Sequence, residues 1–131
     1  RVLFRSQVGI RNETAQKYLV FLPEGESHEL GLLFANYMIR SRGHIVVYLG
    51  QSTPLADLEN LFLKFQPDFL FMTITTGRLP MPLSDYTQAL ASKFPGAEII
   101  VTGEHAIAQK AKLPADVLLM ESVAQFVQFL K

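Results

Sequence analysis

The stretch YLVFLPEGESHELG, residues 18–31, decides the fold. Its first five residues are continuously apolar and are closed by Pro23 and Gly25, a pattern typical of a strand buried on both faces of a parallel sheet. We expect the helix that follows to cover about residues 28–41. Five apolar residues recur there at helical spacing: Leu30, Leu33, Phe34, Tyr37 and Met38. A buried strand, a polar loop and a helix predict the first half of a βαβ unit.

The same alternation continues to the end of the chain. Apolar bursts predict further strands at 45–49, 69–72, 98–101 and 116–119, and the patterns between them predict helices at 54–65, 83–94, 105–110 and 122–130. In the last helix we expect the core face to hold Val123, Phe126, Val127 and Leu130. Five such units predict an α/β fold, a flavodoxin-like or Rossmann-like, doubly wound sheet of five parallel strands with helices on both faces.

The composition fits one folded domain and argues against several function classes. Of 131 residues, 49% are hydrophobic and 18% are charged, which is enough to build a core. Twelve basic and twelve acidic side chains cancel, so this chain has no net field to attract nucleic acid or an anionic membrane. The lack of cysteine excludes disulfides and thiolate chemistry and favours the reducing cytoplasm. No apolar run approaches the ~20 residues that span a bilayer.

Residues 1–16 differ from the rest of the chain in their mixed polar character and the turn-prone segment 11–14. We expect them to be a linker or edge segment that joins an upstream region. The chain starts with Arg1 rather than Met, so we expect it to be a piece of a longer protein.

The fold predicts where a ligand binds. In open parallel sheets, ligands lie beyond the carboxyl ends of the strands, here the loops 23–31, 50–54, 73–78, 102–105 and 120–122. In the first loop His28 offers an imidazole nitrogen to a metal, and Glu26 is placed to hold the other ring nitrogen. Gly31 lets a bulky group approach the backbone. The alternative for His28 is an ordinary polar residue in the first turn of a surface helix, and we expect His44 and His105 to be structural or exposed.

Three short motifs follow the first, third and fourth predicted strands. Glu26-x-His28-x-x-Gly31 resembles the Asp-x-His-x-x-Gly motif of cobalamin-binding domains. Thr73-Ile74-Thr75 resembles that family's Ser-x-Leu motif, and Thr102-Gly103 resembles its Gly-Gly pair. The resemblance covers about residues 17–131 and implies a cobalamin-binding-like domain.

The resemblance implies a role for each motif residue. His28 would be the cobalt ligand, in place of the cofactor's own tail base, and Glu26 would orient its imidazole. The corrin and its nucleotide tail would be lined by Gly31, Gly50, Thr73, Thr75, Thr102 and Gly103. The cofactor would be adenosyl- or methylcobalamin. Thr75 is more polar than the family's Leu, and Thr102 adds a side chain in place of the family's Gly and would narrow the tail channel. The alternative is therefore a degenerate module that binds no corrin.

Residues 22–32, followed by Val47-Tyr48-Leu49-Gly50-Gln51, resemble the C-terminal sensor domains of MerR-like transcriptional regulators. The resemblance implies a cobalamin-sensing module that acts on DNA only through an N-terminal domain absent from this chain, in a full-length protein that forms a homo-oligomer. The alternative is a corrinoid carrier domain of a methyltransferase or mutase.

No catalytic machinery of its own is predicted. The sequence has no paired carboxylates in a catalytic pattern, no Ser/His/Asp set and no phosphate-binding Gly-x-x-x-x-Gly-Lys loop, so we expect a chain that is not an enzyme. A phosphorelay receiver domain needs an aspartate after the third strand, where this chain has Thr73 and its threonine neighbours.

Overall fold

A computed structural model of the chain describes residues 15–62 and 64–130. Its sheet has five strands, β1 (Lys17–Pro23), β2 (Ile45–Thr53), β3 (Phe69–Thr73), β4 (Glu98–Thr102) and β5 (Val117–Met120). All neighbouring strands are parallel, in the order β2-β1-β3-β4-β5. This is the strand order of the flavodoxin-like doubly wound fold, so the expected fold class is confirmed.

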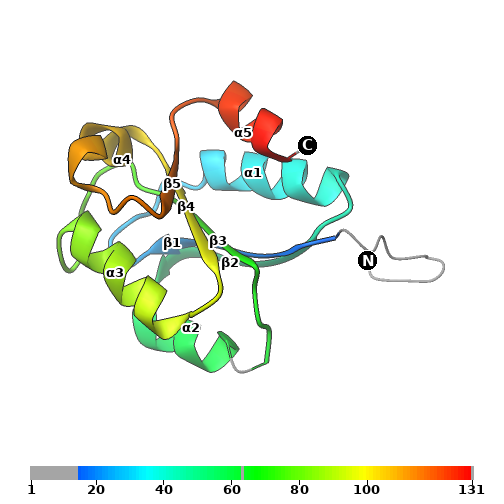
Figure 1. Cartoon of the computed structure of the whole chain (residues 1–131), viewed down its shortest axis with the longest axis horizontal. Coiled ribbons are helices and arrows are strands. Elements are labelled where there is room, and N and C mark those ends of the chain that lie inside the picture. Colours follow the sequence, from blue (N-terminus) through cyan, green and yellow to red (C-terminus); the bar gives the residue numbers. More distant parts are fainter. Residues whose placement is uncertain (1–14, 63, 131) are drawn as a thin grey trace.

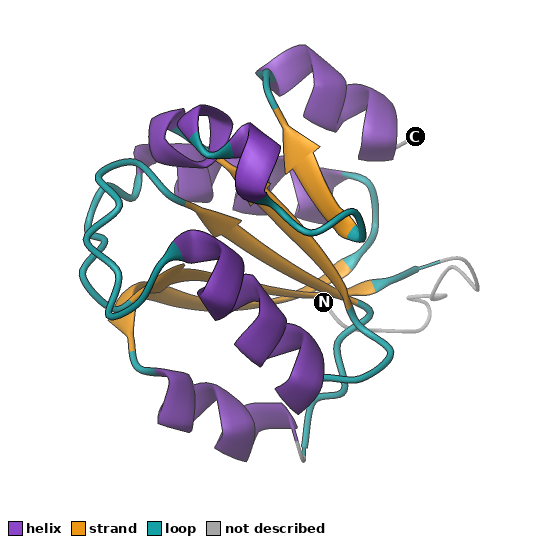
Figure 2. Ribbon diagram, turned by 60° about the vertical axis from the view of Figure 1, so that its left-hand side comes forward, coloured by secondary structure: helices purple, strands orange, loops and turns teal. Residues whose placement is uncertain are grey.

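The helices cover both faces of the sheet. Figure 1 shows α1 (Leu30–Ser41) and α5 (Val123–Leu130) on one side, with α2 (Leu55–Phe62) and α3 (Leu83–Lys93) on the other. The connection after β4 contains the short α4 (Glu104–Ala108) and a 3₁₀ turn at Lys110–Lys112. Figure 2 shows the twisted sheet between the two helical layers. None of the helices within the described residues is long and apolar enough to cross a membrane.

The central strands β1, β3 and β4 are buried on both faces, as their continuous apolar sequences predict, whereas many residues of the edge strands β2 and β5 are half-buried. In β1, Leu19 and Phe21 belong to the core under α2 and α3, whereas Val20 and Leu22 belong to the core under α1 and α5. Successive side chains of a strand point to opposite faces, so only a run without polar residues satisfies both cores.

Helix α1 corrects the sequence analysis in two ways. It begins at Leu30 rather than His28, and its sheet-facing residues are Leu32, Ala35 and Ile39. The apolar set we noted lies largely on the outside, with Leu30 83% and Tyr37 68% exposed. Both sets recur at helical spacing, so periodicity alone does not show which of them meets the sheet.

Other boundaries differ at the strand ends. Strand β2 continues to Thr53 instead of ending at residue 49, and its pairing with β1 shifts register where Phe21 faces Gly50. Val123, expected in the core, is 59% exposed, whereas Phe126 and Leu130 are buried as expected. The expected linker at 1–16 lies outside the described residues except for its last two. There, the Gln16 amide donates a hydrogen bond to Nδ1 of His44 at 3.0 Å.

A glycine substitution tests how tightly the strand ends pack. A Cβ at Gly103, whose φ is +106°, would lie 2.4 Å from the carbonyl oxygen of Ile74. Gly96 has a φ of +92° but nothing within 4 Å of the same position. Gly103→Ala should therefore lower the free energy of unfolding by roughly 3 kcal/mol or more, because a clash adds to backbone strain. Gly96→Ala should cost only about 1 kcal/mol. Urea denaturation measures both, and equal losses would contradict the packing described.

Candidate functional site

A cavity of about 390 Å³ opens at the carboxyl ends of β3, β4 and β5, between α1 and α5. This is the edge of the sheet at which doubly wound folds bind ligands. Six of the eight residues predicted for a ligand site line this one cavity: His28, Gly31, Thr73, Thr75, Thr102 and Gly103. Residues at or after the ends of three separate strands, β1, β3 and β4, thus converge, as the fold predicts.

The walls of the cavity are mostly apolar, and the sequence analysis missed them. They come from α1, α4, α5 and two strands: Phe34, Ala35, Phe71, Ile107, Met120 and Phe126. Each belongs to an apolar pattern that also occurs in an ordinary core, so no local signal separates a wall residue from a core residue. A cavity with such walls suits a bulky organic ligand with few polar groups.

His28 lies at the cavity, in the loop between β1 and α1. Its side chain is exposed and has no hydrogen-bond partner among the described residues. Either ring nitrogen is therefore available to a ligand.

Glu26 does not hold His28 as predicted. Its carboxylate is buried, with 1% of the residue exposed, and its hydrogen bonds all come from residues 75–77. One oxygen accepts from the amides of Thr75 (3.0 Å) and Thr76 (3.3 Å), and the other accepts from the Thr76 hydroxyl (2.9 Å) and the Gly77 amide (2.8 Å). The carboxylate therefore joins the loop after β1 to the loop after β3.

The electrostatics of Glu26 follow from these partners. Burial by itself raises the pKa of a carboxyl group, but the hydrogen bonds from Thr75, Thr76 and Gly77 outweigh burial and hold the pKa of Glu26 below its ordinary value. Glu26 is thus a fixed anion at neutral pH, stabilised by three successive backbone amides.

The two threonines at the strand ends differ in their hydrogen bonds. The Thr102 hydroxyl donates to the carbonyl oxygen of Met120 at 2.6 Å, across β4 and β5. The Thr73 hydroxyl is buried at the cavity and has no partner within the described residues. Since a buried hydroxyl without a partner costs free energy, Thr73 marks a place where a ligand atom can accept or donate.

The predicted glycines Gly31 and Gly50 also differ, because one lines the cavity and the other does not. Gly31 faces the cavity, where a Cβ would lie 3.8 Å from the Thr73 methyl carbon. Gly50 is buried inside β2 and is not part of the lining of this cavity, so its place at the ligand site stays a prediction. It lies beside Glu29 instead, and its φ of +81° accommodates the register shift with β1.

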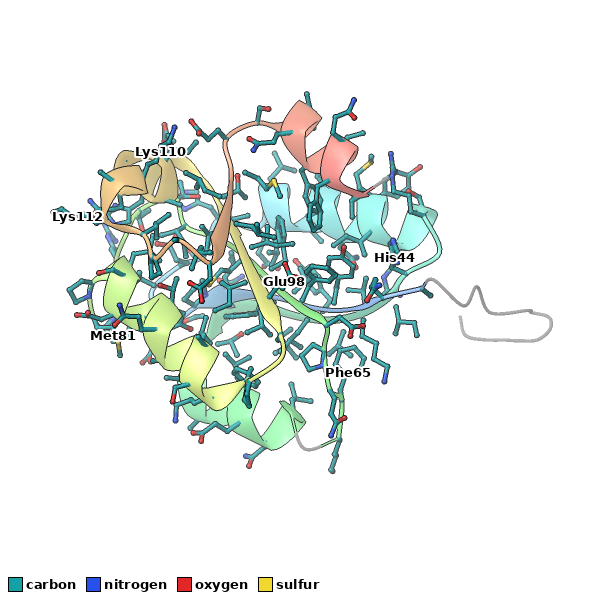
Figure 3. All side chains as sticks on the ribbon, viewed as in Figure 1. His44, Phe65, Met81, Glu98, Lys110 and Lys112 are labelled. Carbon is teal, nitrogen blue, oxygen red and sulfur yellow. The ribbon has the colours of Figure 1, made fainter. Side chains whose placement is uncertain are left out.

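The other two histidines lie away from the cavity lining. Figure 3 shows His44 at the end of the molecule where the described chain begins, opposite the end that carries Lys110 and Lys112. His105 packs against Gly77, where an added Cβ would lie 2.5 Å from the imidazole ring. Only His28 is placed to reach a ligand in this cavity.

The donor set does not suit a free metal ion. Within the described residues, no group of three or more His, Cys, Asp or Glu side chains gathers as metal ligands. A single imidazole suits a metal that brings its other ligands with it in an organic macrocycle, and the apolar walls fit the same chemistry. His28 with the partnerless Thr73 hydroxyl therefore fits a corrin-type group.

Comparison with known proteins agrees with this geometry. No protein-family model matches the chain. The chain is 34% identical over 94 residues to the HTH-type transcriptional repressor CarH of Myxococcus xanthus, covering 71% of this chain and 31% of the repressor. It is 32% identical over 62 residues to the repressor CarA of the same organism, covering 47% of this chain and 22% of the repressor. The chain thus spans about a third or less of these relatives, and its expected similarity to transcriptional regulators is confirmed.

Two solved structures share the fold. A cobalamin-binding protein from Desulfitobacterium hafniense DCB-2 superposes with a TM-score of 0.71 at 16% identity, over 88% of this chain and 58% of that one. The methanol:cobalamin methyltransferase complex MtaBC from Methanosarcina barkeri gives a TM-score of 0.68 at 18% identity, over 86% and 44%. At these identities the likeness establishes the fold, which this chain shares with known corrinoid proteins.

The hydrogen bonds from residues 75–77 to the Glu26 carboxylate, here called the Glu26 clamp, predict that the stability of the fold depends on pH. The folded-state pKa of Glu26 is lower than that of an unfolded glutamate, about 4.3. The stabilisation by this carboxylate is therefore complete at neutral pH and is lost as the pH falls below about 4.3 toward the lowered pKa. Glu26→Gln should destabilise the chain by about 2 kcal/mol at pH 7 and by much less at pH 3.

Urea titrations at both pH values measure this difference. The matched control is Glu59→Gln, because Glu59 is half exposed and forms only a surface ion pair with Lys93 at 3.2 Å. A loss of stability that is the same at both pH values would contradict an ionised Glu26 clamp.

Proposed function

We propose that this chain is the cobalamin-binding sensor module of a MerR-like transcriptional regulator. The observation that carries the proposal is the cavity itself, in which one free imidazole, one partnerless buried hydroxyl and apolar walls meet at the ligand end of the sheet. Similarity to CarH and CarA supports the regulatory role, and the shared fold with cobalamin-binding proteins supports the ligand.

The residues present fit adenosyl- or methylcobalamin, and each has a defined part. When bound, the cofactor would supply a cobalt centre that an imidazole can ligate. His28 would hold the cobalt, and the Thr73 hydroxyl would pair with a polar atom of the cofactor inside the cavity. Gly31 and Gly103 would leave room for the cofactor because they have no side chain, and Thr75 and Thr102 would line the same space.

The outer face of α1 supports a role in signalling. Leu30 and Phe34 line the cavity and are also exposed, and the apolar exposure continues along the helix to Leu33 and Tyr37. Contiguous exposed apolar surface marks a contact site in soluble proteins. A ligand in the cavity therefore changes the surface that α1 offers to an upstream helical segment or a second subunit, and that change alters DNA occupancy.

The remaining properties follow from the sensor role. The module performs no reaction of its own, acts in the cytoplasm and reaches DNA only through another domain of a homo-oligomeric regulator. The second candidate function is a corrinoid carrier domain, which the fold shared with the MtaBC complex favours. A helix-turn-helix upstream in the parent gene supports the sensor, and an adjacent catalytic barrel supports the carrier.

Replacing His28 tests the proposed ligand. The chain should bind methyl-, adenosyl- and hydroxocobalamin and shift their visible spectra to the form in which the tail base is off the cobalt and an imidazole is on. His28→Ala should lose that spectrum and bind on the order of 100-fold more weakly, because a direct metal ligand is removed. His44→Ala is the control, since His44 lies at the opposite end of the sheet. Retention of no corrin by the unaltered chain would instead favour a degenerate module.

Replacing Thr73 separates a ligand contact from a structural one. Thr73→Val keeps the shape of the side chain and removes the partnerless hydroxyl. The free energy of unfolding should stay unchanged or rise, because a buried unsatisfied group is removed. Cobalamin affinity should fall by roughly 3–10-fold, the effect of one lost hydrogen bond. Titration calorimetry and urea denaturation measure the two effects, and a stability loss with unchanged affinity would refute a role in binding.

A further inference from the structure

Two glutamates flank His28, and the structure gives them different partners. Glu26, two residues before the histidine, has both carboxylate oxygens engaged by residues 75–77. Glu29 directly follows the histidine and turns to the other side, toward the end of β2. Both carboxylates are therefore bonded to groups other than the imidazole, and Glu29 is the nearer of the two to His28 along the chain.

Glu29 is held by two side chains of β2. The Tyr48 hydroxyl donates to one carboxylate oxygen at 2.7 Å, and the Gln51 side-chain amide donates to the other at 2.8 Å. Burial and the hydrogen bond to Glu29 raise the pKa of Tyr48 to about 12, so its hydroxyl keeps the proton that it donates. Gly50 lies beside this cluster, where a Cβ would make an ordinary van der Waals contact with the Glu29 carboxylate at 3.5 Å.

Glu29 is also fixed through its backbone. It occupies the N-cap position of α1, and its carbonyl oxygen accepts from the Leu33 amide at 2.8 Å. On the other side of the histidine, the Glu26 carbonyl accepts from the Ser52 amide at 3.1 Å. Ser27 and His28 lie between these two anchors and form no hydrogen bond with another described residue. The nearest anchor to the imidazole is therefore Glu29, one peptide bond away.

We infer that Glu29, held by Tyr48 and Gln51, is the positioning residue for His28, and that Glu26 instead joins the two loops. The inference rests on the proposed function, since it assigns the task of presenting His28 to cobalt. Immobilising a ligand before it binds reduces the entropy lost on binding, so the cluster raises affinity without touching the cofactor.

The test compares Glu29→Ala with Glu26→Gln in the full chain. Glu29→Ala should weaken methylcobalamin binding about tenfold, in the range typical for partners that orient metal ligands. With cob(II)alamin it should reduce the nitrogen splitting in the electron paramagnetic resonance spectrum, which reports the imidazole–cobalt bond. Its thermal midpoint should stay close to that of the unaltered chain. Glu26→Gln should lower the midpoint, and where the chain is folded it should reduce the nitrogen splitting less than Glu29→Ala does.

Conservative variants keep the test decisive. Glu29→Gln should recover part of the affinity, because its amide oxygen still accepts from the Tyr48 hydroxyl, and Tyr48→Phe combined with Gln51→Ala should reproduce Glu29→Ala. Unchanged affinity and splitting in a folded Glu29→Ala variant would overturn the inference.

A second readout needs no cofactor. In the apo chain, ¹⁵N relaxation should show greater motion at residues 27–28 in Glu29→Ala and at residues 75–77 in Glu26→Gln. If the unaltered chain binds no cobalamin, the proposed function fails, and the relaxation data still decide whether Glu29 immobilises the histidine. Equal motion of residues 27–28 in both variants would overturn the inference in that case as well.

Discussion

The geometry of the site depends on the buried carboxylate of Glu26. It lies where β1 and β3 run side by side and their connections separate, α1 to one face of the sheet and α3 to the other. The loops after β1 and β3 neither extend the sheet nor start a helix immediately. Their backbone amides therefore lack the partners that regular secondary structure would provide. Glu26 accepts three of these amides, from Thr75, Thr76 and Gly77. An ionised acceptor makes each such hydrogen bond stronger than a neutral one. The loop that carries His28 and the loop that follows Thr73 are thereby held at one spacing, and the cavity between them keeps its shape.

The sequence predicted which strand ends form this site better than it predicted the hydrogen bonds between the residues there. Apolar runs such as residues 18–22 identify the strands, and the parallel fold then places His28, Thr73 and Thr102 at one edge. The partners of Glu26 could not be predicted in this way, because they lie 49–51 residues away in a loop whose conformation no periodicity describes. The continuation of β2 past Gly50 was missed for a related reason: a glycine after an apolar run predicts a turn, whereas here the strand continues through a register shift.

Helix α1 shows why burial is harder to predict than secondary structure. Its sheet-facing residues and its outer apolar residues both repeat at helical spacing, so the sequence describes a helix with two apolar sides. Packing against the sheet needs only one of them, on which Leu32, Ala35 and Ile39 are buried. The exposed apolar side lowers solubility and adds nothing to the core. Such a side is typical of a surface that contacts another segment or protein. The N-terminal end of this exposed side, at Leu30, borders the cavity.

The fold by itself does not separate a sensor from a carrier, because both kinds of corrinoid protein are compatible with one sheet topology. What separates them is how ligand binding is passed on. A carrier must release its cofactor face to a catalytic partner, whereas a sensor must convert occupancy into a change at an interface. In this chain the histidine loop runs directly into α1, through Glu29 at the helix N-cap, and the exposed apolar side of α1 starts within the cavity lining. His28, the proposed ligand, lies two residues before the first residue of α1, and Glu29 at the N-cap joins it to the helix that carries the contact surface. A displacement of the imidazole therefore reaches that surface through a connection of one residue. That direct mechanical connection is what a sensor requires.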